Sequence, residues 1–269
     1  MLDNPRAARA KAVAALGVRK HRTETGLFLV EGPVAIAEAL RFHRSGLREV
    51  WATPEGVDRA PGLATDLAAA GFEVQLALPA VLSAMADTVS PQGWLAVAKQ
   101  FTTTLEAVLA AAPRLIAVME SAGDPGNVGT VIRSADAAGA DAVILTTGSV
   151  DLYNPKTVRS TMGSIFHVPV VTGLDTNAVV SALHDAGVQV LAADMGGVDL
   201  PELSADGTLA RPTAWVFGTE AHGLSAEARL RADRIAAIPM RGHAESMNVA
   251  MAATVCLFQS AFAQRDGLR

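Results

Sequence analysis

The chain has 269 residues, of which 50% are apolar and only 4% aromatic, and its net charge is −5 at pH 7. This length allows two domains of ordinary size, and a core built from Ala, Val and Leu favours an α/β protein over an all-β sandwich. The single cysteine, Cys256, excludes an intrachain disulfide and a cysteine-rich zinc site. Its apolar neighbours indicate a small buried side chain rather than a nucleophile.

The negative net charge at first argues against nucleic acid as a partner, but positive charge is concentrated at the N-terminus. Residues 1–22 carry six Lys or Arg against one Asp, a balance of +5 that leaves −10 for the rest of the chain. This asymmetry suggests a basic surface for phosphates on an acidic body, although a solvated helix face explains the same charges. No signal-peptide pattern and no apolar stretch of the ~18 residues needed for a membrane span is visible. We therefore expect a cytoplasmic protein without a membrane partner.

The first hundred residues alternate between extended and helical patterns. Short apolar runs stopped by Gly, Pro or charged residues predict strands, and apolar residues three and four positions apart predict helices. The predicted strands are 27–30, 49–52, 72–76 and 93–98, and the predicted helices are 5–16, 33–41, 61–70 and 79–86. This alternation predicts a small α/β domain over 1–100. Residues 101–113 are predicted to be a linker, although the alanine run 109–112 could equally be helical.

A second α/β pattern begins at Arg114 and defines a predicted domain over 114–269. The predicted strands are 115–119, 142–145, 169–171, 188–192, 213–217 and 235–238, and the predicted helices are 127–138, 155–162, 176–186, one from about 225, and 247–264. The strands are apolar throughout rather than alternating. This pattern is typical of a parallel sheet that is covered by helices on both faces.

A glycine-rich turn follows the predicted strand 115–119. Its glycines at 123, 126 and 129 do not form G-x-G-x-x-G, and no acidic residue ends the next strand, so a dinucleotide site is not expected. The Gly-Lys-Ser/Thr ending of a phosphate-binding P-loop is also absent. Asn127 opens the following helix and Arg133 stands six residues later. Arg133 is therefore either a surface arginine or one held at the edge of a site.

A second motif, Gly218-Thr219-Glu220, ends the predicted strand 213–217. Ligands bind beyond the carboxyl ends of strands in parallel sheets, and a glycine at that point lets a ligand approach the backbone. Glu220 could instead cap the helix near Ser225.

A third motif runs from Ile238 to Ala250. Ser246 is a candidate N-cap for the last helix. Asn248 is a poor helix-interior residue, so its position in the first turn suggests a polar role. Met247 could belong to the core or line an adenine pocket, which soft side chains suit.

The three segments, in this order, resemble the signature motifs of the SpoU/TrmH-type RNA 2′-O-methyltransferases of the SPOUT superfamily. The resemblance implies a C-terminal trefoil-knotted, parallel-sheet methyltransferase domain, preceded by a smaller α/β RNA-binding domain. Met247 stands where the family usually has Leu, a nearly volume-conserving change. Ala250 stands where the family usually has Ser, which argues against a hydroxyl-dependent role there.

The resemblance also implies S-adenosyl-L-methionine as the methyl donor and a ribose 2′-hydroxyl as the acceptor. The residues that it assigns to the catalytic and RNA-facing set are Arg133, Asn127, Glu220, Ser246 and Asn248, and those that it assigns to cofactor binding are Gly218, Ile238, Met247 and Thr146. The stretch from Arg19 to Gly32 resembles, more loosely, a ribosomal-protein-like RNA-binding domain. That likeness implies RNA phosphate contacts by Arg19, Lys20, His21 and Arg22.

We interpret the sequence as a ribose 2′-O-methyltransferase of structured RNA, and the resemblance implies a homodimer with its contact in the C-terminal domain. The upstream domain favours rRNA, in particular 23S rRNA, over tRNA, by analogy with relatives. Three alternatives stay open: a tRNA 2′-O-methyltransferase, an antibiotic-resistance rRNA methyltransferase, and a non-catalytic RNA-binding assembly factor. The remaining histidines have no metal-ligand spacing, so no metal is expected.

Overall fold

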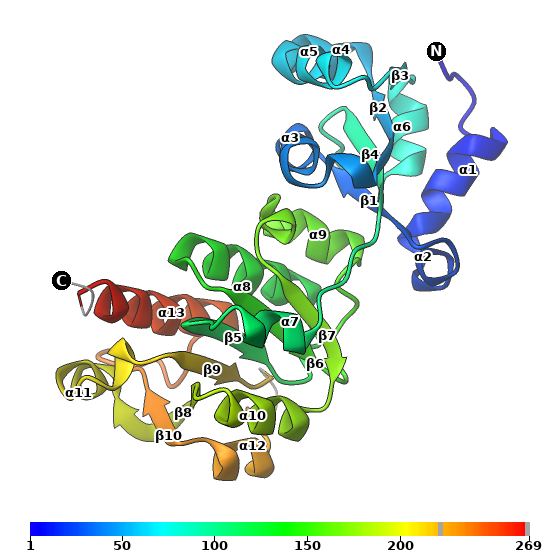
Figure 1. Cartoon of the computed structure of the whole chain (residues 1–269). Coiled ribbons are helices and arrows are strands. Elements are labelled where there is room, and N and C mark those ends of the chain that lie inside the picture. The colour runs from blue at the N-terminus through cyan, green and yellow to red at the C-terminus, as the bar shows by residue number, and fades with distance from the viewer. Residues whose placement is uncertain (220–222, 267–269) are drawn as a thin grey trace. The chain divides into compact units, whose positions relative to one another are not determined.

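The computed structural model describes residues 1–219 and 223–266. The chain forms two compact units. The first contains Met1–Phe101 and Asp151–His167, and the second contains Thr102–Val150 and Val168–Arg269. Figure 1 labels their helices and strands.

The first unit is built on a mixed four-stranded sheet with the order β1-β4-β2-β3. Its strands are β1 (Leu27–Glu31), β2 (Leu47–Ala52), β3 (Val74–Leu76) and β4 (Trp94–Lys99). Strand β4 pairs antiparallel with β1 and β2, whereas β2 and β3 are parallel. The helices are α1 (Ala8–Ala14), α2 (Arg19–Thr25), α3 (Pro33–Phe42), α4 (Pro54–Arg59), α5 (Pro61–Ala69), α6 (Pro79–Met85) and α9 (Pro155–Thr161). Helices α2 and α4 have no counterpart among the predicted elements.

Helix α9 and its flanks reach the first unit from far along the sequence. The Tyr153 hydroxyl accepts a hydrogen bond from the Phe101 amide at 2.9 Å and donates one to the Phe101 carbonyl. Its ring lies 4.6 Å from that of Phe28, between ring centroids. Burial raises the pKa of Tyr153 to about 12, so the hydroxyl keeps its proton.

The compact units therefore divide the chain differently from the predicted boundaries. The prediction placed 151–167 in the domain 114–269, but in the structure this segment packs on β1. Hydrophobic periodicity identifies a helix here and cannot tell which sheet the helix covers. The division into functional domains at 1–100, 101–113 and 114–269 stays a prediction. Within the predicted linker, Leu105–Ala110 forms helix α7, whose cap is the Thr104 hydroxyl.

The second unit contains a six-stranded sheet with the order β10-β8-β9-β5-β6-β7. Its strands are β5 (Leu115–Met119), β6 (Ala142–Thr146), β7 (Val170–Leu174), β8 (Gln189–Asp199), β9 (Thr213–Phe217) and β10 (Arg234–Ala237). Every neighbouring pair is parallel, which confirms the predicted parallel sheet. Strands β5, β6 and β9 are buried along their whole length, as sequences that are apolar except for one terminal Thr in β6 and in β9 favour.

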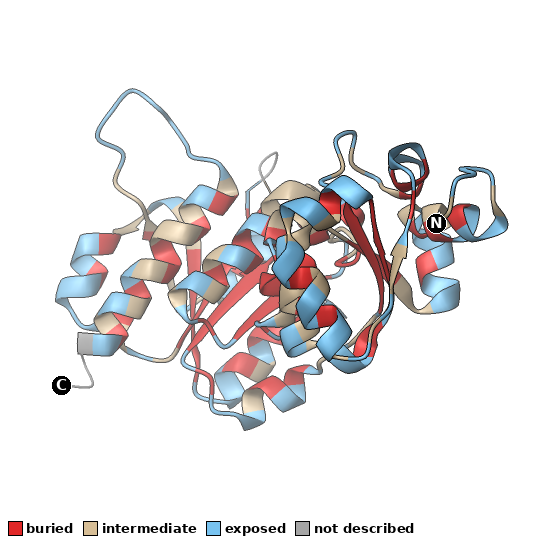
Figure 2. Cartoon of the chain, turned by 90° about the horizontal axis from the view of Figure 1, so that it is seen from above, coloured by how far each residue is buried: buried red, intermediate tan, exposed pale blue. Residues whose placement is uncertain are grey.

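Helices cover both faces of this sheet. They are α7, α8 (Pro125–Ala138), α10 (Thr176–Asp185), α11 (Leu200–Ala205), α12 (Ala226–Arg231) and α13 (Val249–Asp266). Residues of α7, α10 and α12 share one apolar cluster with β5, β8 and β9, whereas α13 packs on α8 and covers the other face. Figure 2 shows the buried strands between these layers.

Cys256 lies buried in α13, and burial raises the pKa of its thiol to about 12. The prediction of a buried side chain is thus confirmed. Among the helices in the described part of the chain, none has the length and apolar character needed to cross a bilayer. Over the same residues, no group of three or more His, Cys, Asp or Glu is placed to hold a metal ion.

Candidate active site

The first motif forms the turn between β5 and α8. The Asp124 carboxylate accepts a hydrogen bond from the Asn127 amide at 2.8 Å and caps α8, with Pro125 in the first turn. Ser121 adopts a left-handed conformation, with φ of 48°, and its amide donates to the Thr146 hydroxyl at 3.0 Å. Thr146 is buried. Thr146 therefore fixes the turn rather than facing a cavity.

The second motif is a loop that leaves the carboxyl end of β9. Thr219 and Gly223 form an antiparallel bridge with backbone hydrogen bonds of 3.0 and 2.8 Å. A Cβ atom on Gly218 would lie 2.1 Å from the carbonyl carbon of Gly223. Only glycine fits such a close backbone approach. The candidate Glu220 lies outside the described residues.

The third motif is an exposed segment between β10 and α13. The Asn248 side-chain oxygen accepts hydrogen bonds from the amides of Ala250 and Met251 at 2.9 and 3.3 Å, so Asn248 caps α13. The prediction of Ser246 as the N-cap was wrong, because the helix begins at Val249, just after Asn248. The polar role expected of Asn248 includes this cap.

Asn248 also joins the third motif to the first. Its side-chain amide donates a hydrogen bond to the side-chain oxygen of Asn127 at 3.0 Å. Farther along the two helices, the hydroxyls of Ser134 and Thr254 lie 2.6 Å apart. Two residues separated by about half the chain are therefore held in one polar pair at the start of α8 and α13.

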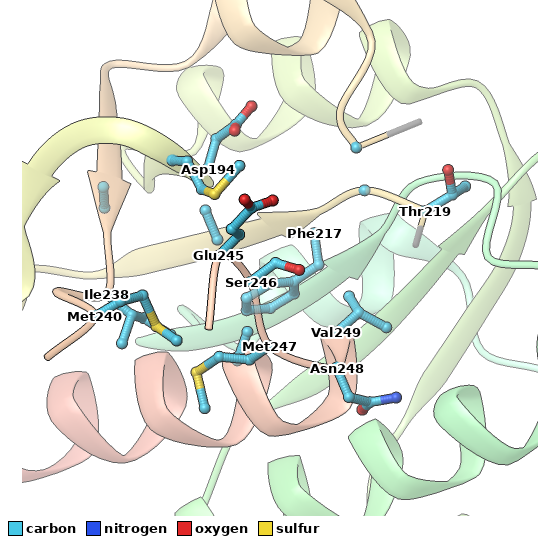
Figure 3. Close-up of a pocket in the computed structure, with 16 residues that line it drawn as sticks. Asp194, Phe217, Thr219, Ile238, Met240, Glu245, Ser246, Met247, Asn248 and Val249 are labelled. Carbon is cyan, nitrogen blue, oxygen red and sulfur yellow. The ribbon is translucent and has the colours of Figure 1, made fainter. Parts of the chain in front are cut away.

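A cavity of about 550 Å³ lies in the second unit, where the second and third motifs meet β8. Its walls come from 193–195 of β8, from 217–219 with Gly223, and from 245–249, with Ile238 and Met240 beside them. Figure 3 shows the side chains of Ile238, Met240, Phe217 and Met247 among those that surround it. Parallel sheets place ligand sites at the carboxyl ends of their strands, as here at β9 and β10.

The candidate residues divide between the cavity and its surroundings. The candidates that line the cavity are Gly218, Ile238, Ser246, Met247 and Asn248. Asn127 reaches the cavity wall through Asn248. Arg133 is exposed on α8 and is not part of the lining, and within the described residues it has no hydrogen bond or ion pair.

Sequence reasoning missed the contribution of β8 to this cavity. Asp194 lines it, and its carboxylate pairs with the guanidinium of Arg229 on α12. The predicted strand ended at 192, whereas β8 continues to Asp199. Gly196 and Gly197 interrupt the apolar pattern, so the sequence does not predict that the strand continues past 192. Glycine is required at 197, because a Cβ there would lie 2.5 Å from the Ile235 carbonyl carbon. Asp194, an acidic residue directly after this apolar run, was the one feature of the sequence that could have indicated a site residue here.

The N-terminal candidates occupy α2 and fall into two groups. Arg19, Lys20 and His21 are exposed, and the latter two lie 3.9 and 3.6 Å from the Glu24 carboxylate. Arg22 is only 2% exposed. Its guanidinium donates to Asp151 and to the carbonyls of residues 16 and 17. Arg22 is thus committed to the interior, which argues against the predicted phosphate contact.

Comparisons with known proteins identify both parts of the chain. Residues 114–258 match the SpoU rRNA Methylase family, and residues 7–96 match the MRM3-like substrate binding domain. The 23S rRNA (guanosine(2553)-2′-O)-methyltransferase RlmP of Bacillus subtilis is 34% identical, over 90% of this chain and 92% of that protein. The 23S rRNA (uridine(2479)-2′-O)-methyltransferase of Streptomyces viridochromogenes is 32% identical, over 92% of this chain and 86% of that protein.

Solved structures agree with these matches. The SpoU methyltransferase AviRb of Streptomyces viridochromogenes, in complex with AdoMet, has a TM-score of 0.82 and 31% identity, and covers 97% of this chain and 100% of its own. The AdoMet-bound rRNA methyltransferase of Sinorhizobium meliloti has a TM-score of 0.81 and 29% identity, and covers 100% of this chain and 98% of its own. On the family match and the extent of these likenesses, the chain belongs to the SpoU rRNA methylase family.

Proposed function

We propose that this protein transfers a methyl group from S-adenosylmethionine to a ribose 2′-hydroxyl of 23S rRNA. The observation that carries the proposal is the 550 Å³ cavity in which the second and third motifs meet, with the first motif joined to its rim by Asn127 and Asn248. Family membership supports the chemistry. The relatives from Bacillus subtilis and Streptomyces viridochromogenes, both named as 23S rRNA 2′-O-methyltransferases, support the substrate.

The cavity suits an adenosyl ligand in size and surface. Its volume falls within the ~300–1,000 Å³ typical of small-molecule sites. Phe217, Ile238 and Met247 offer apolar contacts for a planar base, and the backbone of Gly218 lines the same cavity. When bound, S-adenosylmethionine supplies a methyl group on a positively charged sulfur; its transfer to the ribose oxygen leaves neutral S-adenosylhomocysteine and a released hydroxyl proton.

Replacing Gly218 with alanine is expected to weaken donor binding about tenfold and to cost about 1–3 kcal/mol of stability. The added Cβ would meet the Gly223 backbone, which can yield only if the loop bridge opens. Calorimetric titration with S-adenosylmethionine and urea denaturation measure the two effects. Gly123→Ala is the matched control, because a Cβ at Gly123 has no atom within 4 Å. Equal donor affinity in both variants would contradict the proposed backbone role of Gly218.

The polar residues around the cavity are proposed to position the acceptor. The Asn127–Asn248 pair holds the starts of α8 and α13 together at the cavity wall, and Ser246 presents a hydroxyl at the same edge. A guanidinium is protonated at neutral pH and cannot accept the ribose proton. We therefore propose that Arg133 orients the target ribose by binding the phosphate of the same nucleotide. Its positive charge would also stabilise the negative charge that develops on the ribose oxygen. The role of Glu220 rests on the resemblance alone.

The first unit is proposed to bind rRNA. Its match to a substrate-binding domain supports this role, and the exposed Arg19, Lys20 and His21 are the proposed phosphate contacts. Ribose methylation does not require the enzyme to read the base, and structured RNA is recognised largely through shape, phosphates and 2′-hydroxyls. The remainder of α2 and the buried Arg22 then serve as the scaffold for these three side chains.

A homodimer formed through the second unit is part of the proposal. Helix α13 carries Met251 and Phe262 with exposures of 62% and 55%, and Phe258 lies between them at helical spacing. Exposed apolar rows of this kind are typical of protein contacts, and a two-fold contact would cover the same row on both copies. The trefoil knot of the family and a cytoplasmic location also stay predictions from the sequence.

Mapping of 2′-O-methylated nucleotides in RNA from cells with and without this protein tests the function. One large-subunit rRNA position should lose its methyl group when the protein is absent. Transfer of tritiated methyl groups to purified 23S rRNA and to tRNA then separates the two substrates. Methylation of tRNA alone would refute the rRNA assignment, and the absence of any donor binding would refute the enzymatic one.

A further inference from the structure

The charged side chains of the cavity are all acidic among the described residues. Asp194 and Glu245 are the carboxylates of the lining, and no Lys, Arg or His from the described part of the chain lines the cavity. Figure 3 shows both carboxylates among the side chains that surround it. The cavity wall is otherwise made of apolar side chains, Ser, Thr, Asn and glycine backbone.

The two carboxylates differ in how far they are neutralised. Asp194 pairs with the Arg229 guanidinium, and its side chain is only 18% exposed. Glu245 is exposed, and within the described residues it has no hydrogen bond or ion pair. The negative charge of Glu245 is therefore available to a ligand in the cavity, while Asp194 adds a smaller, partly offset field.

We propose that Glu245, supported by Asp194, makes the cavity prefer the cationic methyl donor over its neutral product. This inference rests on the proposed function. The donor and product share the adenosyl group and the amino-acid tail, so apolar contacts and backbone hydrogen bonds treat them alike. They differ by the methyl group and by one positive charge on sulfur. A carboxylate at the wall acts on that charge, and an interaction of this kind is stronger beside an apolar surface than in water.

The preference has a consequence for turnover. Methyl transfer removes the charge that Glu245 attracts, so the product is held only by the contacts common to both ligands. A site without this carboxylate would bind the two ligands more equally and would be inhibited more strongly by its product. Glu245 is thus a determinant of ligand specificity, and it has no part in the bond-making step.

Calorimetric titrations of the full-length protein with S-adenosylmethionine and, separately, with S-adenosylhomocysteine test the proposal without RNA. In Glu245→Gln, the Kd of the donor should rise about fivefold and that of the product less than about twofold, the order expected for a partly solvated charge. Glu245→Asp keeps the charge and should keep the donor preference within about twofold. Glu227→Gln is the matched control, because Glu227 is an exposed residue of α12 that does not line the cavity.

Ionic strength provides an independent readout. Raising the salt concentration from about 0.05 to 0.5 M should weaken donor binding in the wild type more than in Glu245→Gln, because salt screens an exposed charge. Product binding should change little in either protein. Asp194→Asn leaves Arg229 uncompensated and should lower donor affinity at least as much as Glu245→Gln.

The outcomes separate this inference from the function on which it rests. If the wild type binds neither ligand, both the inference and the proposed function are overturned. If it binds both ligands and Glu245→Gln weakens them equally, or weakens neither, the charge preference alone is overturned. The proposal is supported if Glu245→Gln loses affinity for the donor but not for the product, and if raised salt has the same selective effect on the wild type.

Discussion

Replacing Arg133 with alanine is expected to slow methyl transfer by about 10²–10³-fold while leaving donor affinity unchanged. The size is that of removing one preorganised electrostatic contact to charge that develops in the transition state. Donor affinity should not change, because Arg133 lies outside the lining of the cavity. Single-turnover transfer at saturating donor measures the first quantity, and calorimetric titration of the donor without RNA measures the second.

Two further variants give this prediction a sharp control. Arg133→Lys keeps the charge and loses the planar fork, so an intermediate rate, about tenfold below the wild type, is expected. Arg231 is an exposed arginine on α12 of the same unit, and Arg231→Ala should transfer methyl groups at the wild-type rate. Arg133→Ala within about threefold of the wild type would remove Arg133 from the acceptor site.

The strands of the second unit could be predicted because burial on both faces leaves an unambiguous pattern. Strands β5 and β9 have no polar residue facing solvent, and their predicted limits agree with the structure. The start of α8 was predicted two residues late, because Asp124 rather than Asn127 carries the cap. The first residue of α8 and that of α13 each depend on which polar side chain caps the helix. Several polar residues before each helix could form that cap, and the sequence does not distinguish them.

Parts of the site could not be predicted because they depend on contacts between distant segments. The pairing of Asn248 with Asn127 arises only when the starts of α13 and α8 meet, and the contribution of Asp194 arises only when β8 comes together with the end of β9 and the segment before α13. The roles of the basic residues of α2 also depend on a contact with a distant segment. Its sequence, Arg19-Lys20-His21-Arg22, offers three cations and a histidine with no sequence feature to rank them, and the ion pair with Asp151 of the segment 151–167 separates Arg22 from the other three.

Replacing Arg22 with leucine is expected to destabilise the first unit by about 3 kcal/mol, the lower end of the range for breaking a buried ion pair. Its guanidinium donates to Asp151 at 2.6 and 3.0 Å and to the carbonyls of Leu16 and Gly17 at 2.8 Å each. Leucine would leave the Asp151 carboxylate, whose side chain is 18% exposed, and two carbonyls without these donors. Arg19→Leu, three residues earlier on the exposed side of α2, should change stability by less than about 0.5 kcal/mol.

Hydrogen exchange in a urea series, resolved by peptide, can show which unit loses stability in Arg22→Leu. Amides of β1 and β4 should lose protection in Arg22→Leu, whereas those of β5 and β9 should keep it, because the two pairs belong to different compact units. The Arg22→Leu, Asp151→Asn double variant should recover part of the stability, since the carboxylate charge is then gone. RNA affinity, measured under conditions in which both single variants are folded, should fall in Arg19→Leu more than in Arg22→Leu. The reverse order would return Arg22 to the RNA-binding surface and contradict its assignment to the interior.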